Sequence, residues 1–195
     1  MAQKPILLVK PPDRFLQDEF VYQQLGPHYL QAFLDQNGIT SDILVLYEKP
    51  EIHNQRINEN LDIELDLSDL RMLLLSHDGV SLEIDFDPSL FQNYDTVAMS
   101  VMSPQAPDAY LLNALIRRTC PNVTTVIGGS HPRYYQKQVE NLPEHISFDF
   151  IVPQDGYAEH NPISDWWNDF IFISQRLNIH DKQIKTKTPK LWIKQ

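Results

Sequence analysis

The feature that most constrains the fold is a short apolar run that ends in two glycines. Residues 123–127 read VTTVI, with Pro121 and Asn122 before them and Gly128 and Gly129 after them. A continuous run of this length, rich in β-branched residues, is typical of a strand buried on both faces, as in a parallel sheet. Glycines at its carboxyl end allow a tight turn or the close approach of a ligand to bare backbone. An isolated pair would indicate only a turn, so the neighbouring strands decide its meaning.

Further apolar runs predict strands that alternate with helices along the chain. Strands are expected at residues 6–9, 43–47, 95–101, 123–127 and 148–152. Helices are expected from Leu25 to a cap at Asn37 and Gly38, and near residues 107–118, 134–142 and 164–174. Strand–helix–strand repeats are typical of right-handed βαβ units. We therefore predict an α/β fold with a doubly wound, five-stranded parallel sheet in flavodoxin-like (Rossmann-like) order.

The pattern divides the chain into a body, residues 1–160, and a C-terminal helix with a basic linker or tail, residues 161–195. Residues 48–90 are predicted to be an insertion with one helix and one or two short strands. Within it, residues 61–67 alternate apolar and acidic side chains and indicate a strand, whereas residues 69–79 resemble a helix. The acids of this part fit a solvated face better than a metal site. They are Glu59, Asp62, Glu64, Asp66 and Asp69.

Charge and cysteine content exclude several classes of protein. The net charge of −10 over 195 residues argues against nucleic acid or an anionic membrane as the main partner. No apolar run is long enough to span a bilayer, and the four apolar residues at 6–9 do not fit a signal peptide. The single cysteine, Cys120, excludes an internal disulfide and lies at a predicted helix end as a small structural residue. We predict a soluble, cytoplasmic domain.

The predicted strand ends share one rim, where open α/β sheets bind their ligands. A response-regulator receiver would need acids after the first and third strands, and a flavodoxin would need a phosphate loop where this chain has KPPDRF. The G-x-G-x-x-G turn, the P-loop and a nucleophile elbow are also absent from the sequence. A rim of small, hydroxyl and glycine residues remains, which would admit a long substituent between the strand ends.

Four stretches in order carry a resemblance to a known family. They are ILLVKPP, LGPHYLQAFLDQNGITSDILVLYE, YDTVAMSVMSPQAPDAYLLNALIRRTCPNVTTVIGGSHPRYY and FDFIVPQDGYAEH. Together the chain resembles the N-terminal cobalamin (B12)-binding domain of B12-dependent radical SAM enzymes. The resemblance covers most of residues 5–160 and leaves residues 48–90 unmatched.

The resemblance implies a corrinoid on the carboxyl edge of the sheet, with its dimethylbenzimidazole tail detached from cobalt and threaded into the domain. Hydroxyls of Ser100 and Ser103 would bond the tail, and Gly128 and Gly129 would leave room for it. The turn after the fifth strand matches the family's Gly-Glu-Gly-Glu-like turn only in part, so Tyr157 would stack or line the pocket instead. The implied cofactor-binding residues are Pro11, Pro12, Ser100, Val101, Met102, Ser103, Gly128, Gly129, Ser130, His131, Gln154, Asp155, Gly156 and Tyr157.

The sequence departs from better-known cobalamin proteins after the first strand. Cobalamin mutases carry Asp-x-His-x-x-Gly there, whereas this chain has PPDRFLQDEF and no histidine. Cobalt would then have no protein histidine ligand, and Met102 or the neighbouring backbone would approach its lower face. His28 and His131 are the histidines near the rim, and lone histidines are more often structural than metal-ligating.

One cysteine cannot supply the Cys-x-x-x-Cys-x-x-Cys motif of a radical SAM enzyme. An iron–sulfur cluster and S-adenosylmethionine would therefore belong to a separate or missing domain, and this chain alone is expected to bind without catalysing. Whether it is an excised domain or a stand-alone module is left open. The alternative is a degenerate, non-binding interaction domain of the same fold, favoured by the incomplete turn and by the bulky Tyr134 and Tyr135. Replacing Gly129 by Trp would distinguish the two. A third hypothesis, an α/β enzyme acting on a nucleotide or sugar, lacks a catalytic constellation.

Overall fold

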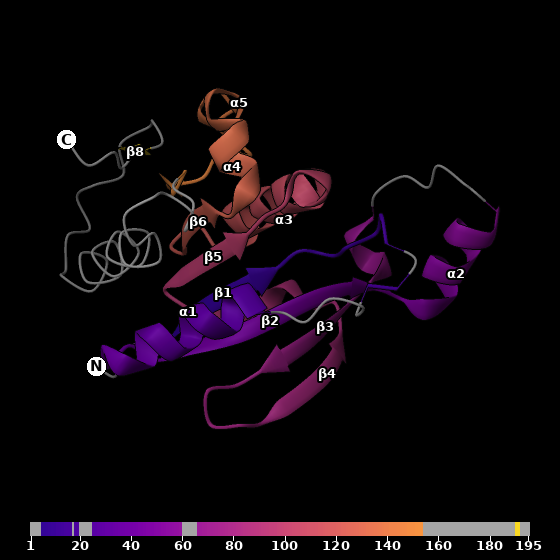
Figure 1. The fold of residues 1–195 in the computed structure, drawn as a ribbon, viewed down its shortest axis with the longest axis horizontal. Helices are drawn as coiled ribbons and strands as arrows, with labels where there is room; N and C mark the ends of the chain where they lie inside the picture. Colours follow the sequence, from indigo (N-terminus) through magenta and orange to yellow (C-terminus); the bar gives the residue numbers. More distant parts are fainter. Residues whose placement is uncertain (1–4, 17, 20–24, 60–65, 154–189, 192–195) are drawn as a thin grey trace.

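The computed structural model describes residues 5–16, 18–19, 25–59, 66–153 and 190–191, and its strands form one sheet (Figure 1). The sheet has eight strands in the order β4-β3-β2-β1-β5-β6-β7-β8. They are β1 (Ile6–Lys10), β2 (Ser41–Glu48), β3 (Leu70–Leu75), β4 (Ser81–Asp85), β5 (Thr96–Ser100), β6 (Thr124–Gly128), β7 (Phe150–Ile151) and β8 (Lys190–Leu191). The predicted α/β class is confirmed.

The sheet is mixed, although most of its pairings are parallel. Strands β2, β1, β5, β6, β7 and β8 pair in parallel, while β3 and β4 extend the β2 edge in antiparallel fashion. The predicted count of five strands, all parallel, is therefore wrong. The two extra strands at the β2 edge come from the insertion, where the expected helix at residues 69–79 is instead strand β3 and the start of a hairpin turn.

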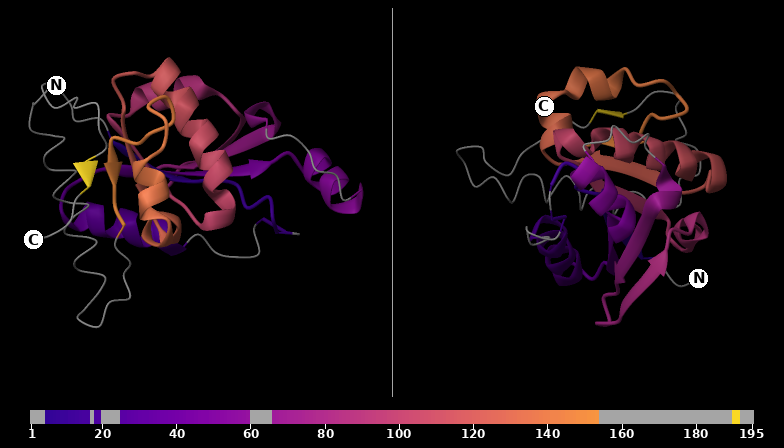
Figure 2. Two further views of the ribbon diagram at one scale, coloured as in Figure 1. Left: turned by 90° about the horizontal axis from the view of Figure 1, so that it is seen from above. Right: turned by 90° about the vertical axis from the view of Figure 1, so that its right-hand side faces the viewer.

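Helices lie on both faces of the sheet (Figure 2). Successive residues of β1 point to opposite faces, so Leu8 packs with the core under α1 (Leu25–Gln36) while Leu7 packs with the core under α3 (Ala106–Thr119). Helix α1 contributes Leu30 and Leu34 to its core. Helix α3 contributes Ala109, Leu112 and Ile116 to the other. This two-sided burial explains why the central strands read as continuous apolar runs.

The remaining helices are short and lie near strand ends. They are α2 (Pro50–Glu59), α4 (Ser130–Tyr134), α5 (Gln136–Glu140) and the 3-10 turns η1 (Leu67–Asp69), η2 (Pro88–Asn93) and η3 (Ser103–Gln105). The single helix predicted at residues 134–142 is instead α4 and α5, separated at Tyr135. The helix predicted at residues 164–174 lies outside the described residues. No helix among those described combines the length and apolar content that a bilayer span requires.

Candidate functional site

Ten of the fourteen predicted cofactor-binding residues lie in three turns at the carboxyl ends of neighbouring strands. Pro11 and Pro12 follow β1, residues 100–103 end β5 and continue into η3, and residues 128–131 end β6 and begin α4. Because β1 pairs with β5, and β5 with β6, in parallel register, these turns share one edge of the sheet. The other four, Gln154, Asp155, Gly156 and Tyr157, lie outside the described residues.

The turns after β5 and β6 are bonded directly to each other. Val101 donates its backbone N–H to the carbonyl of Gly128 over 2.9 Å, and His131 donates to the carbonyl of Val101 over 2.9 Å. Gly129 between them has φ +94°, and a Cβ there would lie 2.7 Å from both the nitrogen and the oxygen of Val101. The missing side chain of Gly129 is thus used for contact between two backbone segments. The sequence predicted that Gly129 leaves room for a ligand, but the contact with the Val101 backbone is enough to explain a glycine at this position.

This contact also changes the value of Gly129→Trp as a discriminator. Any side chain at this position meets the Val101 backbone and adopts a conformation that favours glycine. Loss of cofactor uptake in that variant would therefore report a disrupted turn as readily as a filled binding slot. A test of ligand binding needs a substitution elsewhere on the rim.

A small cavity does lie between Ser100 and Gly128. It is lined by Leu30, Ala98, Met99, Ser100, Val126, Gly128 and Val152, and so lies between α1 and the carboxyl ends of β5 and β6. Its volume is about 10 Å³, which is close to the smallest space that holds one water molecule. The position agrees with the predicted slot, but the described residues leave no room there for a heterocyclic base.

His131 is built into the same turn as a structural side chain. It is 4% exposed, its Nε2 lies 2.7 Å from the hydroxyl of Tyr110, and its Nδ1 lies 3.3 Å from that of Ser103. Its ring also stacks on Tyr135 at 5.1 Å between centroids. Both ring nitrogens therefore have protein partners.

Burial makes His131 a determinant of acid stability. Desolvation lowers the pKa of His131 from its ordinary value of 6.5. As the pH falls below 6.5, the unfolded chain takes up a proton that the folded chain does not, so stability falls until the folded pKa is reached. We expect His131→Gln to lose this part of the pH dependence, measured by urea unfolding between pH 7.5 and 5.5. The exposed His145→Gln is the matched control, and an unchanged slope in His131→Gln would contradict the assignment.

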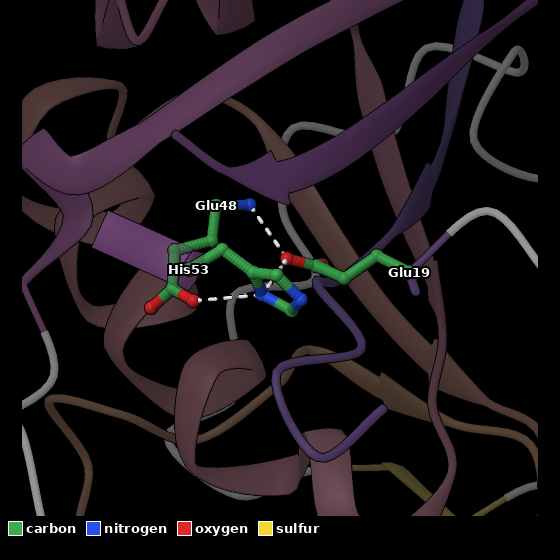
Figure 3. A group of neighbouring side chains, drawn as sticks. All are labelled: Glu19, Glu48 and His53. Carbon is green, nitrogen blue, oxygen red and sulfur yellow. Dashed lines mark hydrogen bonds and ion pairs between the residues drawn. The ribbon is translucent and has the colours of Figure 1, made fainter. Parts of the chain in front are cut away.

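The carboxyl ends of β1 and β2 carry a second group of polar side chains, centred on Glu48 (Figure 3). Glu48 is the last residue of β2, and its side chain is fully buried. One oxygen accepts from Arg14 over 2.7 Å, and the other accepts from Arg56 of α2 over 2.9 Å. Burial opposes ionisation of Glu48, yet hydrogen bonds from Arg56 and the charge of Arg14 hold its pKa below the ordinary range. We call Arg14, Glu19, Glu48, His53, Arg56 and Asp108 the edge network.

Arg14 joins three separate parts of the chain within this network. It lies in the loop after β1, and besides Glu48 it bonds Asp108 in the first turn of α3 over 3.0 Å. It also donates to the backbone carbonyl of Asp66. Burial raises the pKa of Asp108, against the opposing charge of Arg14. The loop after β1 is therefore fastened to β2, α3 and the insertion by one buried guanidinium group.

Glu19 fixes the far end of the same loop. Its two oxygens accept backbone N–H groups from Glu48 and Asp13, each over 2.9 Å, and burial raises the pKa of its carboxyl group despite these bonds. Figure 3 shows the ring of His53 beside both carboxylates. Its Nδ1 lies 3.4 Å from an oxygen of Glu19 and 3.1 Å from an oxygen of Glu48.

One ligand atom each from Glu19, Glu48 and His53 lie within 4.8 Å of one another, which raises the question of a metal ion. Both oxygens of Glu48 already bond arginines, and Arg56 also lies 3.0 Å from the Nδ1 of His53. A divalent cation would have to displace Arg56 and face the repulsion of two guanidinium groups. The arrangement fits an internal ion-pair network better than a metal centre.

The crevice between the ends of β1 and β5 is closed by an amide side chain. Gln105, which is 1% exposed, donates to the carbonyl of Pro11 and to the carboxylate of Asp13, and it accepts the N–H of Met102 over 2.8 Å. Asp13 also pairs with Lys10 at the end of β1. The point at which ligands of such sheets usually enter is thus filled by the chain's own polar groups.

Sequence reasoning missed the edge network. Glu48 directly follows the apolar run of β2, and Arg14 follows β1, so the strand-end rule applied to the rim would have placed both at the same edge. The helix expected near residues 107–118 is α3, and Asp108 lies in its first turn. The pairing of Arg14 with both acids depends on the path of the loop after β1, for which the sequence carries no periodic signal.

A wider hollow lies away from the predicted rim. It measures about 740 Å³ and lies against the outer side of α3, between Asp66, Arg118 and His145. None of the predicted cofactor-binding residues lines it. Acidic and basic side chains both line this hollow, so its charge does not indicate one class of ligand.

Comparison with known proteins finds no matching family model, no matching curated protein and no matching solved structure.

Proposed function

We propose that this chain is a corrinoid-binding module that holds base-off cobalamin at the carboxyl edge of its sheet. Six described strands pair in parallel, and five of them, β2, β1, β5, β6 and β7, lie in the order second, first, third, fourth and fifth along the chain, which is the flavodoxin-like order; β8 adds a sixth beside β7. The sequence resemblance to B12-binding domains of radical SAM enzymes is consistent with this order.

One observation carries the proposal further than the fold. The cavity under α1 is bordered by Ser100 and Gly128, two residues that the resemblance assigns to the nucleotide tail. Ser100 would offer its hydroxyl, and Gly128 would offer backbone without a side chain. A cavity of about 10 Å³ is far too small for a benzimidazole, so binding requires movement of α1 away from β5 and β6. Leu30 of α1 closes the cavity and would be the first side chain displaced.

In this proposal cobalt has no protein histidine ligand, because the sequence after β1 lacks the histidine of Asp-x-His-x-x-Gly. Both nitrogens of His131 are held by Tyr110 and Ser103. Met102, which is 41% exposed beyond the end of β5, is the side chain that would approach the lower face of the metal. Chemistry would come from a separate radical SAM domain or protein that supplies the iron–sulfur cluster, since this chain has one cysteine and Cys120 is buried.

The second candidate is a non-binding interaction domain of the same fold. The specific observation in its favour is the closed edge: Gly129 is packed against Val101, and Gln105 fills the crevice between β1 and β5. The two candidates differ in whether the cavity opens.

Titration with hydroxocobalamin separates them. We expect the purified chain to retain the corrinoid through a desalting column, and Ser100→Leu to weaken retention at least tenfold because the side chain fills the cavity mouth. Ser81→Leu, the same change at an exposed position of β4, is the matched control and should bind as the wild type does. Far-UV circular dichroism checks that both variants fold. A wild-type chain that elutes free of corrinoid would favour the interaction domain.

A further inference from the structure

Strand β4 is the outermost strand at one edge of the described sheet, and it is exposed. It pairs with β3 on one side only, and four of its five residues are exposed, with Ile84 partly buried. Figure 1 shows the β3–β4 hairpin standing at the edge of the molecule. An exposed edge strand offers a row of backbone N–H and C=O groups to another extended chain.

The register of the hairpin identifies the residues whose backbone groups face outward. Ser76 donates its N–H to the carbonyl of Val80 over 2.8 Å, so these two residues form a hydrogen-bonded pair. In an antiparallel ladder such pairs alternate with non-bonded pairs, which makes Leu82 and Ile84 the bonded residues of β4. The backbone groups of Ser81, Glu83 and Asp85 therefore point away from β3.

The same edge is acidic. Four acids lie between residues 78 and 87, namely Asp78, Glu83, Asp85 and Asp87. The side chain of Asp85 is 81% exposed and that of Glu83 is 50% exposed, and Arg71 of β3 pairs with both. The side chains of Glu83 and Asp85 share one face of the strand, while Leu82, 49% exposed, lies on the other.

From these features we propose that β4 binds an extended, cationic segment of a partner protein by strand addition, in which Lys or Arg alternates with apolar residues. Its basic side chains would lie beside Glu83 and Asp85, and its apolar side chains would lie beside Leu82. Cross-strand pairs of opposite charge stabilise such an arrangement. The outward backbone groups of Ser81, Glu83 and Asp85 would supply the main-chain hydrogen bonds.

A second copy of this chain fits the edge less well. Antiparallel pairing of β4 with β4 would bring the carboxylates of Glu83 and Asp85 in one copy against those of the other, and like charges in facing positions are destabilising. Acidic side chains at an edge therefore discourage self-association while they leave a cationic strand free to bind.

Fluorescence anisotropy with labelled peptides tests the proposal on the full chain. The probe is a nine-residue peptide in which Lys alternates with Val. The first control replaces each Lys by Glu, and the second keeps the sequence but carries N-methyl groups on alternate backbone nitrogens. We expect the Lys peptide to bind at least tenfold more tightly than either control, and its affinity to fall with rising salt.

Variants locate the binding on β4. Asp85→Asn should lower the affinity for the Lys peptide at least threefold. Asp35→Asn, the same charge change at an exposed position of α1, should leave the affinity unchanged. Ser81→Pro removes one outward N–H at the first residue of the strand, where proline is tolerated, and should weaken binding as well. Equal binding of the N-methylated peptide would overturn the proposal. So would a dimer of the free chain that Ser81→Pro converts to a monomer, because the edge would then belong to a second copy.

Discussion

Gly129→Ala is expected to lower the free energy of unfolding by about 3 to 5 kcal/mol, combining overpacking with the strain of a backbone conformation (φ +94°, ψ −169°) that is essentially restricted to glycine. The new Cβ would lie 2.7 Å from the nitrogen and oxygen of Val101, and neither atom can rotate away as the end of a side chain could. To remove this steric overlap, the turns after β5 and β6 would have to separate, which would break the hydrogen bond from Val101 to Gly128. Urea unfolding followed by far-UV circular dichroism measures the loss.

A second glycine with a positive φ offers a comparison in which the contact is missing. Gly79 has φ +86°, similar to that of Gly129, but a Cβ built there meets nothing within 4 Å. Gly79→Ala should therefore cost only the conformational term, about 1 to 2 kcal/mol. Equal losses in the two variants would mean that the contact with Val101 is unimportant.

Glu48→Gln is expected to cost about 3 to 5 kcal/mol, the range for breaking a buried ion pair from one side. The substitution keeps the size of the side chain but leaves Arg14 and Arg56 facing a neutral group. The loop after β1 should loosen too, because Arg14 ties it to Asp108 as well. Arg117→Met, which removes a half-exposed pair with Asp149, is the control and should cost under about 1 kcal/mol.

The pH dependence of this effect has a defined sign. The folded pKa of Glu48 lies below its ordinary value of 4.5, so its contribution is complete above about pH 4.5 and is lost as the pH falls through the folded pKa. The difference in stability between wild type and Glu48→Gln should narrow over that acid range. Glu19 and Asp108 have raised pKa values, mainly because of burial, and act in the opposite direction. The charge of Glu48 contributes to raising both, so the pKa values of Glu19 and Asp108 should move toward their ordinary values in Glu48→Gln. A constant difference down to pH 3 would contradict the assignment.

Five of the six parallel strands could be predicted because they read as apolar runs. The sixth, β8, could not, since Lys190–Leu191 lies in the stretch expected to be a basic linker or tail. β1, β2, β5 and β6 lie within a residue or two of the expected ranges, and of the expected strand at 148–152 only Phe150–Ile151 pairs as β7. The same signal failed at β3, whose sequence LRMLLL suits a buried helix as well as a strand. Pairing with β4 selects the strand over the helix, and local periodicity does not predict which segments pair.

The candidate site divides in the same way. The rim turns were predictable because strand ends of a parallel sheet meet at one edge, and Ser100 and Gly128 do border one cavity there. Two other features could not be predicted: the contact between Gly129 and Val101, and the pairing of Arg14 with Glu48 and Asp108. Each depends on the path of a loop in space, and residue type alone does not distinguish a glycine that admits a ligand from one that admits backbone.

The two bonds that tie the turns after β5 and β6 have a kinetic consequence. The amide of Val101 is protected by Gly128, and the amide of His131 is protected by Val101, so neither turn can lift without exposing protons of both. Amide hydrogens at positions 101 and 131 should then exchange with deuterated solvent at a common rate, set by one opening event. For any molecule to insert at this edge, the two turns would have to open together rather than one at a time.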